Sequence, residues 1–181
     1  TYFFKHTPFA ATAILFPNLQ PWTNISAISP LRTPNETGFV LYSEGKVTVP
    51  PVGFLHFEDP PGDVHIKYGF VSGDEYYVLK MASGFYENPA LDLPVSDGLL
   101  LVFSQETGHL ELILLDECWL TDMRTAAAGA VAAKHLAASA VHRIGIVGTG
   151  VQARMQLEML RDVVDCQRCL IWGRDADKAR R

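Results

Sequence analysis

The sequence has little positive charge. Its 15 lysines and arginines are outnumbered by 20 aspartates and glutamates, which leaves a formal net charge of −5 at pH 7. Proteins that bind nucleic acid usually carry a basic face, so this balance offers no footprint for such a partner. Long apolar runs are missing too, since none reaches the roughly 18 residues that a membrane span needs. We therefore expect no contact with nucleic acid or membrane, and a small molecule or a protein as partner.

Cysteine is scarce, with three residues in a chain of 181. Cys166 and Cys169 have the CxxC spacing of a redox pair or of half a zinc site, but no second such pair or paired histidine follows them. Cys169 also begins an apolar run, where cysteine packs as a small hydrophobic side chain. We favour that interpretation, expect no metal, and expect a reduced, cytoplasmic protein.

Acidic residues are absent from the first 35 positions, which contain five prolines. The aromatic residues of this stretch follow neither helical nor strand periodicity, and the residue before each proline is disfavoured in a helix. We expect residues 1–35 to be irregular. The whole length suits one domain, or one domain with a piece of another.

Residues 36 to about 115 show short β-strands in succession, which predicts a sheet or half-barrel. Pro50 and Pro51 confine their stretch to a sheet edge or a bulge. Gly108 takes the left-handed position in a predicted hairpin turn that begins at Gln105. The expected strands are residues 38–43, 47–57, 63–71, 76–81, 98–104 and 109–115.

The sequence changes character at about residue 120. Thr121 can cap a helix, Asp122 suits the positive end of its dipole, and residues 123–137 are strong helix formers apart from Gly129. The many alanines make this helix thin enough to pack very close to a neighbour. A strand, a helix and a strand are then expected at residues 143–147, 151–164 and 168–173, the start of a parallel sheet. We predict an α/β protein, in which a mixed β domain precedes the first β-α-β of an incomplete second domain.

The turn between that strand and helix carries a G-x-G-x-x-A fingerprint. Gly148 allows a tight turn, Gly150 lets a pyrophosphate approach the backbone, and Ala153 keeps the helix close to the strand. The helix N-terminus presents unpaired N–H groups to the anion. A strand before the motif and a helix and strand after it favour dinucleotide binding over a simple tight turn. The predicted cofactor-binding residues are Gly148, Thr149, Gly150, Val151, Gln152 and Ala153.

The end of the second strand normally selects between the two nicotinamide dinucleotides. An acidic residue there binds the ribose 2′-OH of NAD, whereas an arginine accommodates the 2′-phosphate of NADP. This chain has Arg174 at the approximate position, followed by Asp175. We therefore favour NADP over NAD, add Arg174 to the cofactor-binding residues, and interpret the charged residues after it as a solvated helical turn.

Four segments are similar to one known family. They are Phe39–Lys46, Lys80–Tyr86, Leu120–Ala128 and Gly148–Ala153. On these segments residues 36–181 resemble the ornithine cyclodeaminase/μ-crystallin family, and the RTAA stretch followed by GxGxQA is particularly specific. Residues 1–35 do not look like the family.

The resemblance implies a substrate-binding and dimerisation domain over residues 36–140, which ends in the alanine-rich linking helix. It implies the start of a Rossmann NAD(P)-binding domain over residues 141–181. The implied activity is hydride transfer at the α carbon of an amino or imino acid, by a lyase or an imine reductase, in a protein that forms a homodimer when full length. The alternatives are a μ-crystallin-like NADP-dependent ligand-binding protein and an inactive gene fragment.

The same resemblance assigns roles to two basic residues. Lys80 corresponds to the family lysine that contacts the substrate near its carboxylate and could pass a proton, and Arg124 corresponds to the arginine that clamps the carboxylate. A planar guanidinium suits this role because it can hold a carboxylate with two parallel hydrogen bonds. Without the resemblance, a surface lysine and an arginine in a structural salt bridge are the simpler interpretations.

The chain departs from the family pattern in two ways. Family members commonly have a basic residue on the strand after the Pro-Pro segment, and this chain has none at the expected place. His56, His65 or Lys67 could substitute, and we include Lys67 among the substrate-binding candidates. The catalytic aspartate of the family belongs beyond Arg181, so we expect the 181-residue chain alone to bind cofactor poorly and not to turn over. An acidic residue downstream would favour an enzyme, and a non-acidic one a binding protein.

Overall fold

The structure is a computed structural model that describes residues 12–15 and 32–180, and the described residues divide into two compact units. The first unit comprises residues 12–15 and 40–119, and the second comprises residues 32–39 and 120–180. The alanine-rich helix therefore belongs almost entirely to the second unit, whereas it was predicted to end the first domain.

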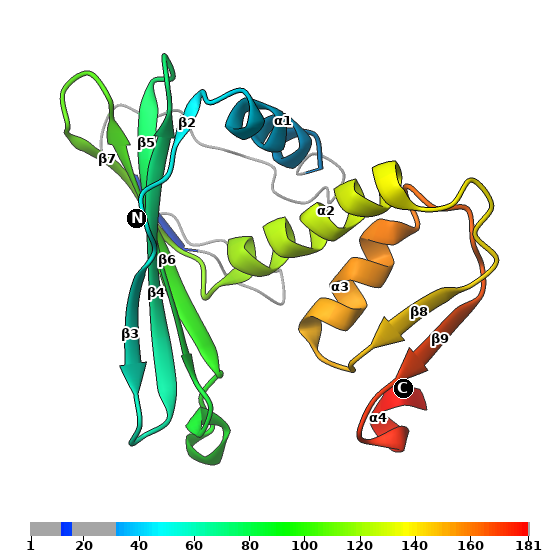
Figure 1. Cartoon of the computed structure of the whole chain (residues 1–181). Coiled ribbons are helices and arrows are strands. Elements are labelled where there is room, and N and C mark those ends of the chain that lie inside the picture. The colour runs from blue at the N-terminus through cyan, green and yellow to red at the C-terminus, as the bar shows by residue number, and fades with distance from the viewer. Residues whose placement is uncertain (1–11, 16–31, 181) are drawn as a thin grey trace. The chain divides into compact units, whose positions relative to one another are not determined.

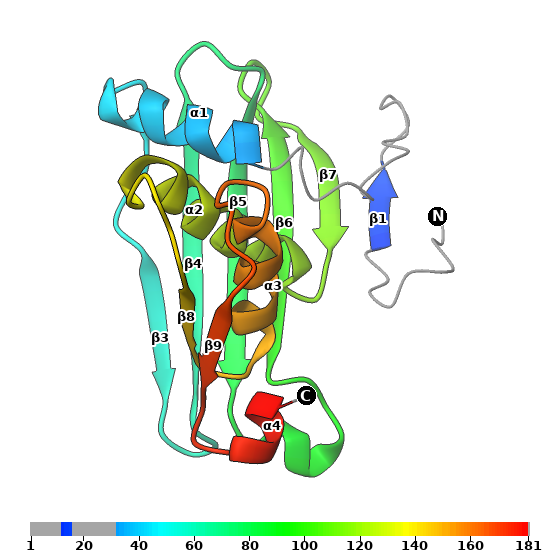
Figure 2. The same ribbon diagram turned by 90° about the vertical axis from the view of Figure 1, so that its right-hand side faces the viewer.

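A sheet of seven strands forms the first unit, in the order β1-β7-β6-β5-β4-β2, with β3 also paired to β4 (Figures 1 and 2). Every neighbouring pair is antiparallel. Val64, Ile66 and Tyr68 of β4 share one face, because successive side chains of a strand point to opposite faces, while β6 and β7 are nearly continuous apolar runs. The strands are β1 Thr12–Leu15, β2 Val47–Thr48, β3 Gly53–Phe57, β4 Gly62–Val71, β5 Tyr76–Phe85, β6 Ser96–Ser104 and β7 Leu110–Leu115.

Two predictions about this sheet are confirmed. The stretch with Pro50 and Pro51 lies at a sheet edge, where it separates β2 from β3, and both short strands pair with β4. The turn between β6 and β7 contains Gly108 with φ of +72°, in the left-handed region. Ser104 Oγ supports this turn because it accepts hydrogen bonds of 3.2 Å from the N–H groups of Glu106 and Thr107.

The strand predicted at residues 38–43 is wrong, because this segment belongs to helix α1, Arg32–Ser43. A short apolar run fits a strand or a helix equally well, and only its surroundings decide. Pro34 lies in the first turn of α1, where a missing N–H costs nothing. Residues 32–35 are therefore helical, and residues 12–15 form β1, whereas both segments were expected to be irregular. The rest of residues 1–31 lies outside the described part of the chain.

The second unit contains a long helix and a β-α-β segment. Its two strands, β8 and β9, are parallel, with Ile144 opposite Cys169 and Val147 opposite Trp172. The buried residues of α2 are mostly small, and they include Ala126 and Ala127. The elements are α2 Trp119–Leu136, β8 Ile144–Val147, α3 Val151–Leu160, β9 Cys169–Trp172 and α4 Ala176–Arg180.

Helix α2 begins before the expected cap. Trp119 is its first residue, and the N–H of Trp119 donates to the carbonyl of Asp116 at 2.7 Å. Thr121 therefore lies inside the helix, where its carbonyl accepts a 2.7 Å hydrogen bond from Thr125 Oγ1. The prediction of Thr121 as N-cap is wrong, because a turn of the preceding loop starts the helix two residues earlier.

Candidate functional site

The glycine turn joins β8 to α3 within the second unit. Gly148 has φ of +120°, a backbone conformation that residues with a Cβ rarely adopt. Its N–H donates to the carbonyl of Trp172 at 2.7 Å. A Cβ at Gly148 or Gly150 would meet no atom within 4 Å, so the turn is open to a ligand. Gly148 is therefore required by backbone conformation rather than by crowding.

The N-terminus of α3 opens directly from this turn. Gly150 is the N-cap residue, with an extended backbone, and it has no side chain to accept from the first N–H groups of the helix. Such N–H groups and the helix dipole favour a phosphate or another anion. Ala153 donates its own N–H to the carbonyl of Gly150 at 3.1 Å, and Val151 is exposed. The turn thus fits the pyrophosphate of a dinucleotide by its shape and its donors.

The glycine turn also touches the end of β9. A Cβ at Gly173 would lie 2.6 Å from Thr149 Cγ2, so a glycine at this position lets the turn approach the strand. Gly173 was not among the predicted site residues. Its position directly after the second strand could have indicated it, because the end of that strand lies beside the G-x-G-x-x-A turn in a parallel β-α-β segment.

Arg174 and Asp175 follow β9, and the Asp175 side chain forms hydrogen bonds to the next helix, α4. Asp175 Oδ1 accepts hydrogen bonds from the N–H groups of Asp177 at 3.0 Å and Lys178 at 3.2 Å, so it caps α4. Arg174 is exposed to solvent. Oδ1 of the Asp175 carboxylate therefore has a structural role, while the guanidinium of Arg174 is accessible.

Gln152 does not project into solvent at the turn. Its Nε2 donates to the backbone carbonyl of Asp122 at 3.1 Å and to Asp122 Oδ1 at 3.0 Å. Its Oε1 accepts from Gln156 Nε2 at 3.3 Å. This residue of the fingerprint thus links α3 to the first turn of α2, a contact that the motif alone does not reveal.

Arg124 is an exposed residue of α2. We expected it in the first turn of a helix, but α2 begins at Trp119, so Arg124 lies in the second turn. The effect of the helix dipole falls off within the first turn, so any anion bound by Arg124 depends on its guanidinium alone.

Lys67 and Lys80 face each other across β4 and β5 in the first unit. They are directly paired in the antiparallel register, so both side chains lie on one face of the sheet. Both residues are half-buried. Like charges directly opposite each other are unfavourable in a sheet, and an anionic group beside them removes that penalty. The register therefore brings two of the predicted substrate-binding residues together.

An aromatic and ionic cluster lies on the same face, two residues along β4. His65 Nε2 is 3.2 Å from Asp63 Oδ1, and the Tyr86 hydroxyl donates to Asp63 Oδ2. This hydrogen bond to Asp63 raises the pKa of Tyr86 above its ordinary value. Phe54 contacts both candidate histidines, with ring centroids 5.0 Å from His65 and 6.3 Å from His56. The sequence analysis missed Asp63 and Tyr86, although the i, i+2 spacing of Asp63 and His65 places them on one face.

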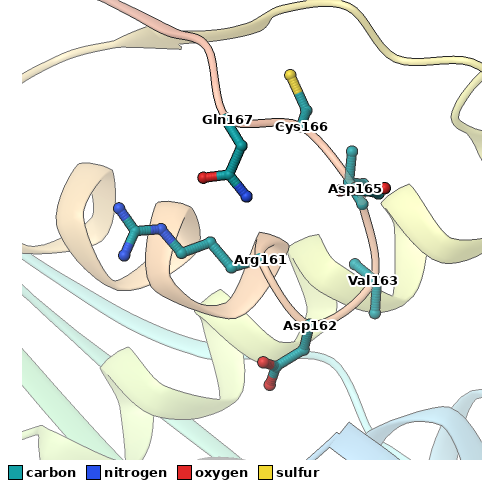
Figure 3. Close-up of a pocket in the computed structure, with 7 residues that line it drawn as sticks. Arg161, Asp162, Val163, Asp165, Cys166 and Gln167 are labelled. Atoms are coloured by element: carbon teal, nitrogen blue, oxygen red, sulfur yellow. The ribbon is translucent and has the colours of Figure 1, made fainter.

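A shallow hollow lies in the loop between α3 and β9 and is lined by residues 161–167 (Figure 3). These residues form one continuous loop, and the figure shows the side chains of Arg161 and Gln167 on it. The loop leads into the amino end of β9, whereas the glycine turn follows the carboxyl end of β8. Because β8 and β9 are parallel, the hollow lies at the opposite end of this sheet from the turn, and we do not assign the site to it.

The described residues form neither a metal site nor a membrane-spanning helix. Residues 12–15 and 32–180 contain no cluster of three or more His, Cys, Asp or Glu side chains that could hold a metal ion. None of the helices in those ranges is long and apolar enough to span a membrane. Cys166 and Cys169 are not joined in a disulfide, and Cys166 Sγ lies 3.5 Å from the carbonyl of Arg168.

The motif segments match a family model over most of the chain. The model described as the ornithine cyclodeaminase/mu-crystallin family covers residues 23–181. The chain belongs to this family. The match to the ornithine cyclodeaminase/mu-crystallin family begins before residue 36, where the resemblance in the sequence was expected to start, and it includes all of α1.

Curated proteins and solved structures agree with this assignment. An uncharacterized cyclodeaminase of Sinorhizobium fredii is 42% identical over 133 residues, which are 74% of this chain and 40% of that protein. The Δ1-pyrroline-2-carboxylate reductase of Thermococcus litoralis, solved with NADH and L-proline, is 28% identical with a TM-score of 0.80, over 87% of this chain and 48% of that one. An archaeal alanine dehydrogenase dimer with bound NAD is 33% identical with a TM-score of 0.78, over 85% and 47%. The chain thus spans less than half the length of these relatives.

Proposed function

We propose that this chain is part of an NAD(P)-dependent enzyme that acts by hydride transfer at the α carbon of an amino or imino acid. The observation that carries the proposal is the open glycine turn at Gly148, which leads into the uncapped N-terminus of α3. The relatives support it, because one is named a cyclodeaminase and one is a reductase solved with NADH and L-proline. Cyclodeamination and imine reduction share the hydride step, and both remain within the proposal.

The residues of the second unit would hold the dinucleotide in separate ways. Backbone N–H groups at Gly150 and the start of α3 suit the pyrophosphate, and Gly148 permits the turn that exposes them. Arg174 is accessible for a 2′-phosphate, while Asp175 is committed to capping α4. We therefore propose NADP as the preferred cofactor. The chemistry that the dinucleotide supplies when bound is hydride transfer.

Substrate contacts are proposed for three basic residues. Arg124 would bind a carboxylate through two parallel hydrogen bonds. Lys67 and Lys80 share one face of the first unit, where their paired charges favour an anionic group. Lys80 would also donate or accept the proton that accompanies hydride transfer, since its ammonium group carries exchangeable protons on the same face as Lys67. We further propose a homodimer for the full-length protein, as in the archaeal relative.

The test uses the full-length protein with NADPH or NADH and Δ1-pyrroline-2-carboxylate, followed by the loss of dinucleotide absorbance. Ammonia release from L-ornithine with the oxidised dinucleotide tests the cyclodeaminase reaction. Arg124→Lys keeps the charge but removes the planar fork, so the KM of the active substrate is expected to rise about tenfold with an unchanged affinity for dinucleotide. A protein that binds neither dinucleotide contradicts the proposal, and binding without turnover in either assay favours a ligand-binding protein.

A further inference from the structure

Both ends of the Gln152 amide are occupied: its NH2 group contacts α2, and its oxygen accepts a hydrogen bond within α3. Its two N–H donors are taken by the backbone carbonyl and the Oδ1 of Asp122, and its oxygen is taken by Gln156 Nε2. All these groups lie in the second unit, where Figure 1 shows α2 and α3 side by side. A side chain whose donors are all occupied has no remaining N–H for a dinucleotide phosphate.

A second contact shows that the two helices are held close together. A Cβ at Gly129 would lie 2.9 Å from Gln156 Oε1, so α3 passes α2 where α2 has no side chain. Glycine inside a helix costs about 1 kcal/mol relative to alanine, and here it permits the close approach. Gly129 lies seven residues after Asp122, which is about two helical turns and therefore the same face of α2.

These two contacts fix α2 in rotation about its own axis. With Asp122 and Gly129 against α3, Arg124 lies about 200° around the helix from Asp122 and points away from α3. The pair of hydrogen bonds at Asp122 adds to the buried residues of α2, Met123, Ala126 and Ala127 among them, in holding its first turns at this angle. The direction of the exposed Arg124 side chain thus depends on Gln152.

We infer that Gln152 is a positioning residue, which orients Arg124 toward the substrate through Asp122 instead of binding the cofactor. The inference rests on the proposed function and deepens it, because it ties the helix that opens from the glycine turn to the helix that carries the substrate arginine. It replaces the cofactor contact predicted for the Gln152 side chain, while its backbone N–H stays part of the α3 N-terminus.

The test compares three measurements on full-length Gln152→Met, which keeps the length of the side chain and loses its hydrogen bonds. The KM for Δ1-pyrroline-2-carboxylate is expected to rise about tenfold, the size expected for lost hydrogen bonds that hold a charged group. The dissociation constant of NADPH, measured by fluorescence, stays within about twofold because the backbone holds the phosphates. A weaker NADPH affinity with unchanged KM shows a cofactor contact and overturns the inference, as does a lower Tm with both constants unchanged.

Paired variants separate the Asp122 link from a general loss of packing. Asp122→Asn keeps an oxygen acceptor for Gln152, so its KM is expected closer to wild type than that of Asp122→Leu. Gln152→Met combined with Asp122→Leu should raise KM no more than Gln152→Met alone, because Asp122→Leu removes only one of the two hydrogen bonds that Gln152→Met removes. Additive effects contradict the inference. Gln167→Met, an exposed substitution in the loop before β9, is the matched control.

The wild-type protein in the same assay distinguishes two kinds of failure. If it binds neither NADPH nor NADH, the proposed function fails and Gln152 has no substrate arginine to position. If it turns over and Gln152→Met leaves the KM unchanged, the inference alone fails.

Discussion

The two units position their candidate site residues in different ways, the first by strand register and the second by a local turn. In the first unit, Lys67 and Lys80 meet because two strands pair in one register, and a shift by one residue would move either side chain to the other face. In the second unit, the glycine turn is formed by consecutive residues, and Gly148 and Gly150 determine its shape locally. The glycine turn should therefore tolerate change in its surroundings better than the lysine pair does, but it tolerates no side chain at Gly148.

The largest effect is expected at Gly148. In Gly148→Val the backbone cannot keep φ of +120° without strain of about 1–3 kcal/mol, so the turn moves and the affinity of the full-length protein for NADPH falls about ten- to hundredfold. Fluorescence titration with NADPH measures the loss. Gly145→Ala is the control, because Gly145 lies in β8 with nothing within 4 Å of an added Cβ, and its affinity should stay at the wild-type level. Equal losses in both variants would contradict a specific role for the turn.

A smaller and selective effect is expected at Arg174. Arg174→Gln removes the accessible guanidinium, so the dissociation constant of NADPH should rise about tenfold while that of NADH stays unchanged. Arg180→Gln is the matched control, because Arg180 is exposed on α4 and its guanidinium lies 3.4 Å from Asp177 Oδ1. If the ratio of the two constants does not move, Arg174 has no part in cofactor selection.

The contrast between the units also explains what could be predicted from the sequence. The glycine turn, the parallel β-α-β and the edge position of Pro50 and Pro51 follow from local patterns, and the structure has each of them. The partner of Lys67 did not follow, because strand register depends on which distant strand pairs with which. The apolar residues 38–43 were interpreted as a strand because a short run carries no decisive period, and the hydrogen bonds of Glu36 to Lys134 and His135 lie outside that run.

The Gln152 contact marks the limit of motif reasoning in the second unit. The G-x-G-x-x-A motif predicts where the backbone turns. It does not tell whether its glutamine side chain lies beside a phosphate or contacts a neighbouring helix, because the spacing in the sequence is the same in both cases. Only the position of α2, with Asp122 within hydrogen-bond distance, separates the two interpretations.

The lysine pair offers a test of the first unit by itself. Lys67→Met removes one of two paired like charges, so the free energy of unfolding of the anion-free protein should stay unchanged or rise by up to about 1 kcal/mol. Lys80→Met removes the other charge and is compared with it for the effect of a ligand. Under the proposed function, saturating L-proline, the ligand of the Thermococcus litoralis relative, is expected to raise the Tm of the full-length wild-type protein. This rise should shrink in both variants, because the carboxylate loses a cation. Thermal scans with and without L-proline measure both effects. Lys46→Met serves as control, since Lys46 pairs with Glu44 at 2.7 Å on the exposed surface. An undiminished L-proline shift in both variants removes the pair from the substrate site.

The smallest expected effect concerns Glu36, which joins α1 to the end of α2 within the second unit. Its carboxylate accepts from Lys134 Nζ at 2.9 and 2.8 Å, and Oε1 lies 2.6 Å from His135 Nε2. These hydrogen bonds, that of Lys134 first and that of His135 second, hold the pKa of Glu36 below its ordinary value of 4.5. A carboxyl whose pKa is lowered in the folded state stabilises the fold above its unfolded pKa and loses this contribution as the pH falls.

Glu36→Gln should therefore lower the Tm at neutral pH by a small amount, because the pair is solvent-exposed. The difference from wild type should begin to narrow as the pH falls below about 4.5, where the unfolded carboxyl takes up its proton, and vanish below the lowered pKa of Glu36 in the folded state. Thermal scans at several pH values measure this convergence. Glu44→Gln, which removes an ion pair between residues close in sequence, is the control for a general loss of surface charge. A Tm difference that persists unchanged at low pH would contradict this account. Glu36 would then join α1 to α2 through packing contacts that glutamine disrupts at every pH, and not through its charge.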